Sequence, residues 1–396
     1  MCSRALAYFA IIHLRPARFR HGDPCDMICG SIGRAFALLC SVTIAATSVG
    51  HADDASNDRV IAEKTEIIAA DPTNAAAYEL RGEAYYMKHD KDRAFDDCSA
   101  AIRIDPNFGR AYHCRGRAYA AKGDRDHAMA DYKEAIRLDP DYGPSYTSRA
   151  EEYINKRDFD LAIADLTEAI ERSPIKAYRA LVMRGQAYAL KGDNDRAVAD
   201  YTEAMQRNPA AAWPYELRST ILLNKNEIDA ALADCDSAVR LEPASAGGHY
   251  CRAMVFLKKD DFDGTIRELD DVTRIMPSFE RAYRIRAVVL HRKGDDKRAL
   301  ADFDEAIRLQ PGDTEVYIDR AGVFRDMGLH EGALADYKEA LRLDPKNQIA
   351  LVNRGLLYMM MSDAKHARAD FNTVLALPPT DKWAVDTARE GLGFVK

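Results

Sequence analysis

A proline recurs through most of this chain at an almost constant interval. The interval is 34 residues at every step except one of 35, which separates Pro174 from Pro209. The series consists of Pro72, Pro106, Pro140, Pro174, Pro209, Pro243, Pro277, Pro311, Pro345 and Pro379. A fixed period of this size indicates an array of one supersecondary unit whose copies stack on one another. The 396 residues therefore count repeats rather than globular domains.

One period, Phe108–Pro140, predicts what the unit folds into. Both of its halves carry small and aromatic residues at helical spacing. Gly123 breaks the pattern between them, and Asp124 follows where it can cap the second helix. Pro140 ends that helix, because proline cannot continue it. Each unit is therefore predicted to be two antiparallel helices joined by a tight turn.

These units resemble the tetratricopeptide repeat, with the closing proline numbered as position 32. Position 8 is small: Gly82, Gly116, Ala150, Gly185, Ser219, Ala253, Ala287, Ala321 and Gly355. Position 20 is small in all but one: Ala94, Ala128, Ala162, Ala197, Ala231, Thr265, Ala299, Ala333 and Ala367. Position 11 is aromatic or leucine: Tyr85, Tyr119, Tyr153, Tyr188, Leu222, Phe256, Leu290, Phe324 and Tyr358. The resemblance implies an all-α fold, an α-solenoid that winds as a right-handed superhelix of nine helix–turn–helix repeats.

The repeats leave short segments at both ends. Residues 75–379 hold the nine repeats, residues 53–74 an N-terminal capping helix and residues 380–396 a C-terminal one, with Trp383 and Leu392 as its anchors. Such caps are expected because terminal repeats would otherwise expose an apolar face.

The 35-residue step is an irregularity inside the array. It places an extra residue near Ile175 and Lys176. We interpret it as a loop insertion; the alternative is a local change in superhelical pitch.

Residues 1–52 do not follow the repeat. An apolar stretch from Ala35 to Val49 follows a basic residue and closes with small residues before Ala52. This is the layout of a secretory signal peptide cleaved after Ala52. Translation is expected to begin at Met27, and the alternative is an unusually long signal region from Met1. The stretch is too short for a comfortable membrane span, so no stable insertion is expected after its removal.

The charge balance bears on the class of partner. The chain carries −7 in all and the first 52 residues +3, which leaves −10 for the repeats. An acidic array without a basic stripe repels polyphosphate, so no nucleic-acid partner is expected.

Two columns of opposite charge run through all nine repeats. Position 7 is always arginine: Arg81, Arg115, Arg149, Arg184, Arg218, Arg252, Arg286, Arg320 and Arg354. Position 23 is always acidic: Asp97, Asp131, Asp165, Asp200, Asp234, Glu268, Asp302, Asp336 and Asp370. We expect each arginine to pair with an acid of its own or the preceding repeat, as a structural ladder. The alternative is an anion-binding track of unpaired guanidiniums.

Four cysteines follow the leader, in two pairs with the same spacing. Cys98 and Cys114 are 16 residues apart, and so are Cys235 and Cys251. In an oxidising compartment this duplication suggests two disulfides that staple neighbouring repeats. Free thiols that simply fill small apolar sites are the alternative.

A groove along the first helices is the expected binding surface. In the resemblance, positions 2, 5, 9, 12 and 13 line it. The candidates are Val182, Trp213, Leu223, Tyr250, Met254, Leu257, Arg281, Arg284, His291 and Arg292. The middle repeats would bind an apolar or amphipathic segment and the seventh would read an acidic neighbour of it.

No catalytic motif stands apart from the repeats. There is no nucleophile elbow, phosphate-binding glycine loop or metal-ligand spacing in the sequence, so no enzyme activity, cofactor or metal is expected. His113 and His249 are expected to be surface residues.

The sequence thus predicts an exported, periplasmic scaffold that binds a peptide or helix of a partner protein and has no enzymatic activity. The alternatives are an accessory or substrate-docking subunit of an envelope enzyme or secretion complex, and a cytoplasmic co-chaperone-type adaptor. The sequence does not choose between monomer and self-association.

Overall fold

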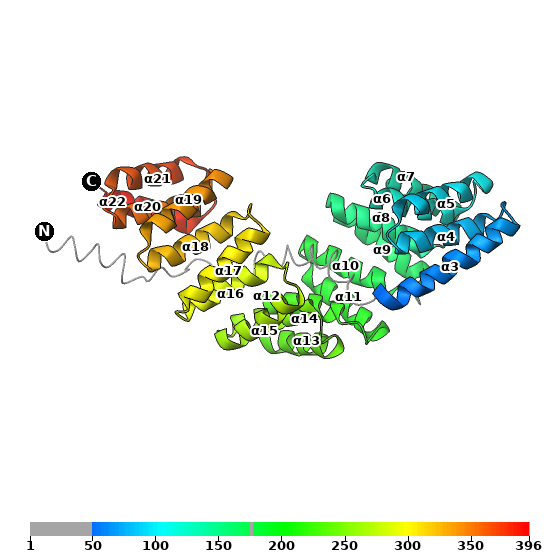
Figure 1. Cartoon of the computed structure of the whole chain (residues 1–396), viewed down its shortest axis with the longest axis horizontal. Coiled ribbons are helices and arrows are strands. Elements are labelled where there is room, and N and C mark those ends of the chain that lie inside the picture. The colour runs from blue at the N-terminus through cyan, green and yellow to red at the C-terminus, as the bar shows by residue number, and fades with distance from the viewer. Residues whose placement is uncertain (1–49, 175–176, 396) are drawn as a thin grey trace. The chain divides into compact units, whose positions relative to one another are not determined.

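The computed structural model describes residues 50–174 and 177–395. Over these residues the chain forms α-helices and no strand (Figure 1). The helices are α3 (Gly50–Ala70), α4 (Ala75–Met87), α5 (Lys91–Ile104), α6 (Gly109–Ala121), α7 (Arg125–Leu138), α8 (Gly143–Lys156), α9 (Phe159–Arg172), α10 (Tyr178–Lys191), α11 (Asn194–Arg207), α12 (Trp213–Asn224), α13 (Ile228–Leu241), α14 (Ala246–Lys258), α15 (Phe262–Ile275), α16 (Glu280–Arg292), α17 (Asp296–Leu309), α18 (Thr314–Asp326), α19 (His330–Leu343), α20 (Gln348–Met360), α21 (Ala364–Ala376) and α22 (Lys382–Phe394).

The helices from α4 to α21 form nine hairpins, one for each predicted repeat. In each hairpin the even-numbered helix is the first helix and the odd-numbered helix the second. The chain divides into two units, which are described separately. Residues up to Pro243 hold α3 to α13 and five hairpins, and residues from Ala244 hold α14 to α22 and four hairpins.

Every turn inside a hairpin contains one residue with a left-handed backbone. It lies at position 15 of each repeat: His89, Gly123, Arg157, Gly192, Asn226, Asp260, Gly294, Gly328 and Ser362. Only four of the nine are glycine, the residue that adopts positive φ without a steric cost. The turn is therefore fixed by the packing of the two helices more than by the residue at position 15.

The second helices begin with acidic caps. The Asp124 side chain accepts a hydrogen bond from the backbone N–H of His127, as predicted, and five other aspartates at this position do the same. Such a cap satisfies a backbone donor that the helix itself cannot use.

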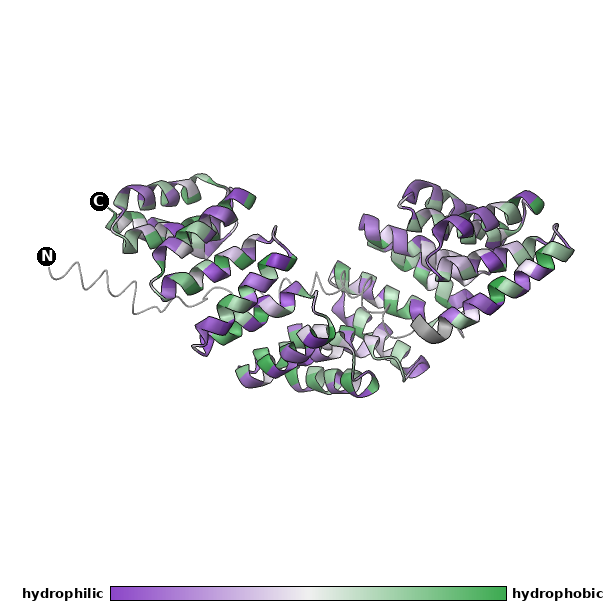
Figure 2. Cartoon of the chain, in the orientation of Figure 1, coloured by the Kyte–Doolittle hydropathy of each residue, from purple (hydrophilic) through white to green (hydrophobic). Residues whose placement is uncertain are grey.

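The core of each hairpin depends on the small residues at positions 8 and 20. Gly185, for example, lies so close to Tyr201 that an added Cβ would be 2.6 Å from the ring. Tyr201 is itself buried, with 1% of its surface exposed. Figure 2 shows hydrophobic and hydrophilic residues alternating along the helices, as expected when one stripe faces this core.

The ends of the array agree with the expected caps. α3 ends at Ala70, just before Asp71-Pro72, and α22 packs Trp383 and Leu392 against a core cluster that contains Phe371. Within the described residues no helix has the length and apolar character needed to cross a membrane.

Two predictions fall on residues outside the described part of the chain. These are the leader up to Val49 and the insertion at Ile175 and Lys176. The cleavage site, the start at Met27 and the origin of the 35-residue step therefore stay predictions, as does the handedness of the superhelix.

Candidate functional site

The arginine–carboxylate ladder forms within each repeat. In eight repeats the position-7 arginine donates from Nε and Nη2 to the two carboxylate oxygens of its own position-23 aspartate, at 2.7–2.9 Å. In the sixth repeat, Arg252 Nη2 lies 3.1 Å from Glu268 Oε1. The acids are buried, and hydrogen bonding to Asp200 raises the pKa of Arg184. The guanidiniums therefore hold the repeats together and do not form an anion-binding track.

The same arginines also reach the preceding repeat. Arg184 Nη1 donates to Thr167 Oγ1 on α9 at 3.1 Å, and Arg286 Nη1 to Asp270 on α15 at 2.8 Å. Five acceptors of this bond occupy position 25, namely Thr65, Thr167, Thr202, Asp270 and Asp304, and Arg286 also donates to Thr273 at position 28. In Arg286 and Arg320 both parts of the prediction occur together, because each pairs with an acid of its own repeat and with one of the preceding repeat.

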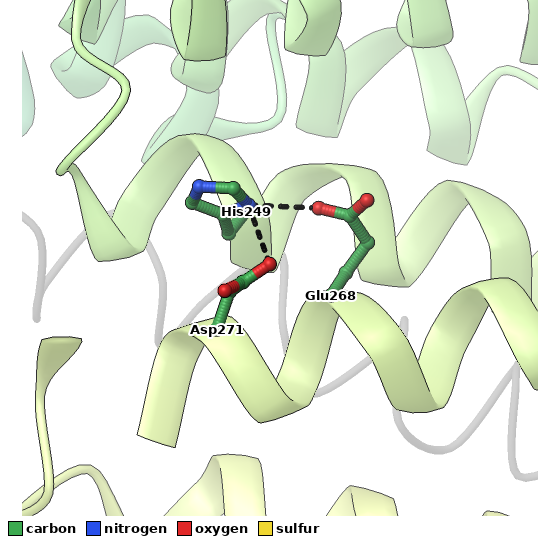
Figure 3. Close-up of side chains that lie close together, drawn as sticks. All are labelled: His249, Glu268 and Asp271. Atoms are coloured by element: carbon green, nitrogen blue, oxygen red, sulfur yellow. Dashed lines mark hydrogen bonds and ion pairs between the residues drawn. The ribbon is translucent and has the colours of Figure 1, made fainter. Parts of the chain in front are cut away.

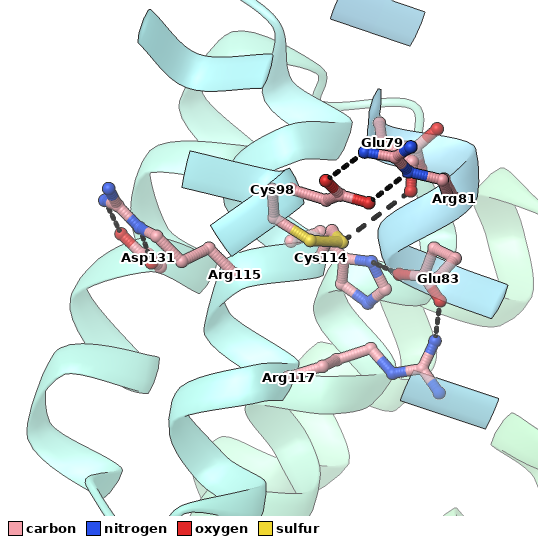
Figure 4. Close-up of a disulfide and its surroundings, with 10 residues drawn as sticks. Glu79, Arg81, Glu83, Cys98, Cys114, Arg115, Arg117 and Asp131 are labelled. Atoms are coloured by element: carbon pink, nitrogen blue, oxygen red, sulfur yellow. Dashed lines mark hydrogen bonds and ion pairs between the residues drawn. A yellow bond between two sulfur atoms is a disulfide. The ribbon is translucent and has the colours of Figure 1, made fainter. Parts of the chain in front are cut away.

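The first of the two expected disulfides is present in the N-terminal unit. Cys98 on α5 is bonded to Cys114 on α6, with 5.8 Å between their Cα atoms, and so joins the first repeat to the second (Figure 4). Cys235 and Cys251 belong to different units of the chain. Their pairing stays a prediction.

The first helices lie beside one another and provide the candidate binding face. α4 contacts α6, and α8 contacts α10, which contacts α12; in the other unit α16 contacts α18, which contacts α20. On this face, side chains meet partners about one repeat away in the sequence, as His113 meets Ser148 and Arg117 meets Glu83. Contacts between neighbouring repeats therefore form this face, and the sequence of a single repeat does not predict them.

Several expected groove residues are buried. Val182 belongs to a core cluster against which Trp213 also packs, and Tyr250 meets Phe279 edge-on at 5.1 Å between ring centroids. The buried members of the expected set are Val182, Leu223, Tyr250, Met254 and Leu257. The expectation that these side chains are exposed is wrong, because neighbouring side chains cover them.

The basic residues of the seventh repeat are also engaged. Arg284 donates to Asp319 on α18 at 2.8 Å and pairs with Glu315, and both acids raise its pKa. His291 lies between Asp296 at 2.6 Å and Asp326 at 3.4 Å, and these hydrogen bonds raise its pKa. Arg284 and His291 therefore tie first helices to their neighbours rather than presenting unpaired charge. Of the other two arginines, Arg281 is half-buried and Arg292 lies 5.9 Å from the centre of the Phe262 ring.

A polar cluster on α4 and α6 was missed in the sequence. Arg117 pairs with Glu83, 34 residues earlier (Figure 4). Its guanidinium lies 3.9 Å from the centre of the Tyr86 ring. Burial beside Glu83 raises the pKa of Glu79 to about 7. A search for opposite charges 34 or 35 residues apart would have found Arg117–Glu83, and Arg284–Asp319 as well.

Neither of the two histidines expected at the surface is exposed: His113 is buried and His249 is mostly buried. His113 on α6 is 3% exposed, and its Nε2 shares a hydrogen bond of 3.1 Å with Ser148 Oγ on α8. Its burial lowers the pKa of the imidazole to about 3, so the ring is neutral. The His249 side chain is 11% exposed and lies beside Glu268 and Asp271.

Polar atoms without a hydrogen-bond partner gather on the first helices of the N-terminal unit. Each of these five helices contributes at least one buried atom of this kind among the described residues. They include Glu83 Oε1, His113 Nδ1, Glu152 Oε2, Gln186 Nε2 and Trp213 Nε1. Second helices of this unit contribute Ser99 Oγ alone within the described part. Four of the five side chains occupy positions 2, 5 or 9, which the resemblance assigns to the groove.

Fold and repeat together define an α-solenoid of helical hairpins. Family models described as "Tetratricopeptide repeat" match residues 65–107, 147–212 and 250–314 in one case and 109–142 in another. A third, described as "TPR repeat", matches residues 321–362. The chain belongs to the tetratricopeptide repeat family.

The chain is also similar to several solved structures. A tetratricopeptide repeat protein from Parabacteroides merdae is 18% identical, with a TM-score of 0.50 over 63% of this chain and 99% of that one. Pseudomonas aeruginosa pilF is 15% identical, with a TM-score of 0.47 over 51% and 92% of the two chains. Yeast Tom70 is 14% identical, with a TM-score of 0.48 over 98% and 90%. Among curated proteins none matches this chain.

Proposed function

We propose that the chain is a non-enzymatic scaffold that binds a segment of a partner protein along the first helices of its N-terminal unit. The observation that carries this proposal is the row of buried polar atoms that make no hydrogen bond, from Glu83 on α4 to Trp213 on α12. Glu83 Oε1 lies 3.8 Å from His113 Nδ1 and Glu152 Oε2 lies 3.7 Å from Arg125 Nε, both beyond hydrogen-bond distance. A buried polar atom without a partner costs about 1–3 kcal/mol. A peptide backbone offers both N–H and C=O groups, so a bound segment can form hydrogen bonds with these atoms whatever its own side chains are.

The polar character of the row favours a polypeptide over an apolar ligand. Gln186 Nε2 and Trp213 Nε1 are donors, whereas Glu83 Oε1 accepts. The five side chains of the row occur on successive first helices. An extended or helical polypeptide segment can reach several of them.

Site-specific photocrosslinking tests this proposal. A photoreactive amino acid at Gln186, on α10, should crosslink to a partner polypeptide. The same probe at Glu203 on α11 of the same repeat, whose side chain is 43% exposed, should not. Equal crosslinking at the two sites would argue against the face. With the partner identified, Gln186→Leu and Trp213→Phe should each weaken binding about tenfold, since each removes a donor worth about 1–1.5 kcal/mol.

We further propose that the scaffold acts in the periplasm. The signal-like segment that ends at Ala52 supports export, and so does the Cys98–Cys114 disulfide, since disulfides persist in oxidising compartments. Amino-terminal sequencing of the cellular protein should begin near Asp53. A protein that keeps its leader and stays in the cytoplasm would contradict this location.

A further inference from the structure

The sixth repeat departs from the others at three positions that meet in space. Position 4 is tyrosine in six repeats, namely Tyr78, Tyr112, Tyr146, Tyr215, Tyr283 and Tyr317, but it is His249 here. Position 23 is aspartate in eight repeats and Glu268 here. Position 26 holds Asp271. The fold of the repeat does not require these changes, because eight copies form the same hairpin without that combination.

The three side chains converge between α14 and α15 (Figure 3). His249 Nδ1 lies 2.8 Å from Glu268 Oε2 and 3.9 Å from Asp271 Oδ2. Glu268 and Asp271 are one helical turn apart on α15, so both point toward the imidazole on α14. One atom from each of the three residues lies within 4.8 Å of the others.

The outer oxygen of each carboxylate is held by an arginine. Arg252 Nη2 lies 3.1 Å from Glu268 Oε1, and Arg274 Nη2 lies 2.5 Å from Asp271 Oδ1. This leaves Oε2 of Glu268 and Oδ2 of Asp271 as the oxygens directed at His249. Outer partners of this kind orient the ligands of a metal site.

We infer that His249, Glu268 and Asp271 form a zinc site in the C-terminal unit. Imidazole nitrogen and carboxylate oxygen are ligands that Zn²⁺ accepts, and a solvent molecule can supply the fourth position of a tetrahedron. With metal–ligand bonds of about 2.1 Å, neighbouring ligands of a tetrahedral zinc ion lie about 3.4 Å apart. The distances of 2.8 Å and 3.9 Å from His249 Nδ1 lie on either side of this value, so small side-chain shifts suffice.

Burial distinguishes this group from the His366–Asp363 pair of the same unit. The side chains of His249 and Glu268 are 11% and 10% exposed, and Asp271, at 39%, opens the site to solvent. His366, by contrast, is 57% exposed and has Asp363 beside it at 2.6 Å as its single carboxylate. His366 thus provides a matched control on α21.

Titration of the untagged, oxidised full-length protein with ZnCl₂, followed by calorimetry, tests the site. The wild type should bind a single equivalent of Zn²⁺, and Co²⁺ should give the absorption bands of a tetrahedral complex. Either His249→Tyr or Glu268→Asp restores the residue that other repeats carry, so both variants should fold. Each should weaken Zn²⁺ binding by at least about tenfold, the scale on which even outer partners of a metal affect affinity. His366→Tyr should bind as the wild type does.

Thermal unfolding separates a metal site from a purely structural ion pair. Zn²⁺ should raise the Tm of the wild type and of His366→Tyr but not that of His249→Tyr, because a ligand that binds the folded state alone stabilises it. A Tm that Zn²⁺ leaves unchanged, or equal Zn²⁺ affinity in the wild type and His249→Tyr, would overturn the inference.

Discussion

The guanidinium of Arg184 has five N–H donors, and three of its nitrogens are used on two other helices. Two bonds go to Asp200 within the repeat, and the third goes to Thr167 of the preceding one. Because Asp200 is buried, its charge depends on this arginine. Arg184 therefore joins the two helices of its own hairpin and also fixes the position of that hairpin against the preceding one.

The Arg184–Asp200 pair can be tested by removing one partner and then both. Arg184→Met should destabilise the protein by about 3 kcal/mol, since it leaves a buried carboxylate without its cation. Adding Asp200→Leu should restore most of the loss, because an apolar pair of similar size needs no compensating charge. Urea unfolding measures both variants. A double variant that is less stable than Arg184→Met alone would contradict this account.

The raised pKa of Glu79 predicts how the folding stability of the protein changes with pH. Burial beside Glu83 raises its pKa from 4.5 to about 7. Between these two values the folded state holds a proton that the unfolded chain has released, so stability falls as the pH rises through this window. Glu79→Gln should reduce this loss of folding stability by up to ~3 kcal/mol, since each pKa unit corresponds to about 1.4 kcal/mol.

The control for this effect is Glu203→Gln on the exposed face of α11. Urea unfolding at several values between pH 4.5 and 8 should give the same slope for this variant as for the wild type. A slope that Glu79→Gln leaves unchanged would show that another group titrates in this window.

At the scale of helices, the side chain that faces position 8 limits how closely the two helices of a hairpin approach each other. Glycine at this position lies against the position-24 side chain of the partner helix, as Gly355 lies against Phe371. At Gly82 the position-24 side chain is Cys98, whose Sγ would lie 2.7 Å from an added Cβ. The space available at position 8 thus depends on the side chain at position 24 as well.

Two glycines of the C-terminal unit should respond in opposite directions to alanine. At Gly355 a Cβ would lie 2.6 Å from the Phe371 ring, so Gly355→Ala should cost about 1–3 kcal/mol through overpacking. At Gly322 on α18 nothing lies within 4 Å of an added Cβ. Gly322→Ala should therefore stabilise the protein by about 0.5–1 kcal/mol, the usual gain in a helix interior. Thermal unfolding compares the two, and the same sign for both would refute this explanation.

At the scale of the whole molecule, the period of the prolines and the residues of one repeat were enough to predict nine hairpins and their turns. The two columns of opposite charge predicted the pairing of Arg184 with Asp200. All of these depend on contacts within a repeat. Contacts between first helices were not predicted. Arg284 was expected to face a partner, but Asp319 lies 35 residues away on the next first helix and neutralises it. Val182 was expected in the groove, but the core beside Trp213 covers it. Such contacts depend on the rotation from repeat to repeat, which no single unit encodes.

A repeat array whose units contact chiefly their neighbours should also respond locally to the loss of a crosslink. The Cys98–Cys114 disulfide closes a segment of 16 residues, and a crosslink of about this length contributes roughly 3 kcal/mol. The variant Cys98→Ala/Cys114→Ala should therefore lose hydrogen-exchange protection in α4 to α7. Because stability in a solenoid is close to a sum over units and neighbouring interfaces, α16 to α21 should keep theirs. An equal loss in both regions would mean that the array unfolds as one cooperative body, and it would contradict the nearest-neighbour description.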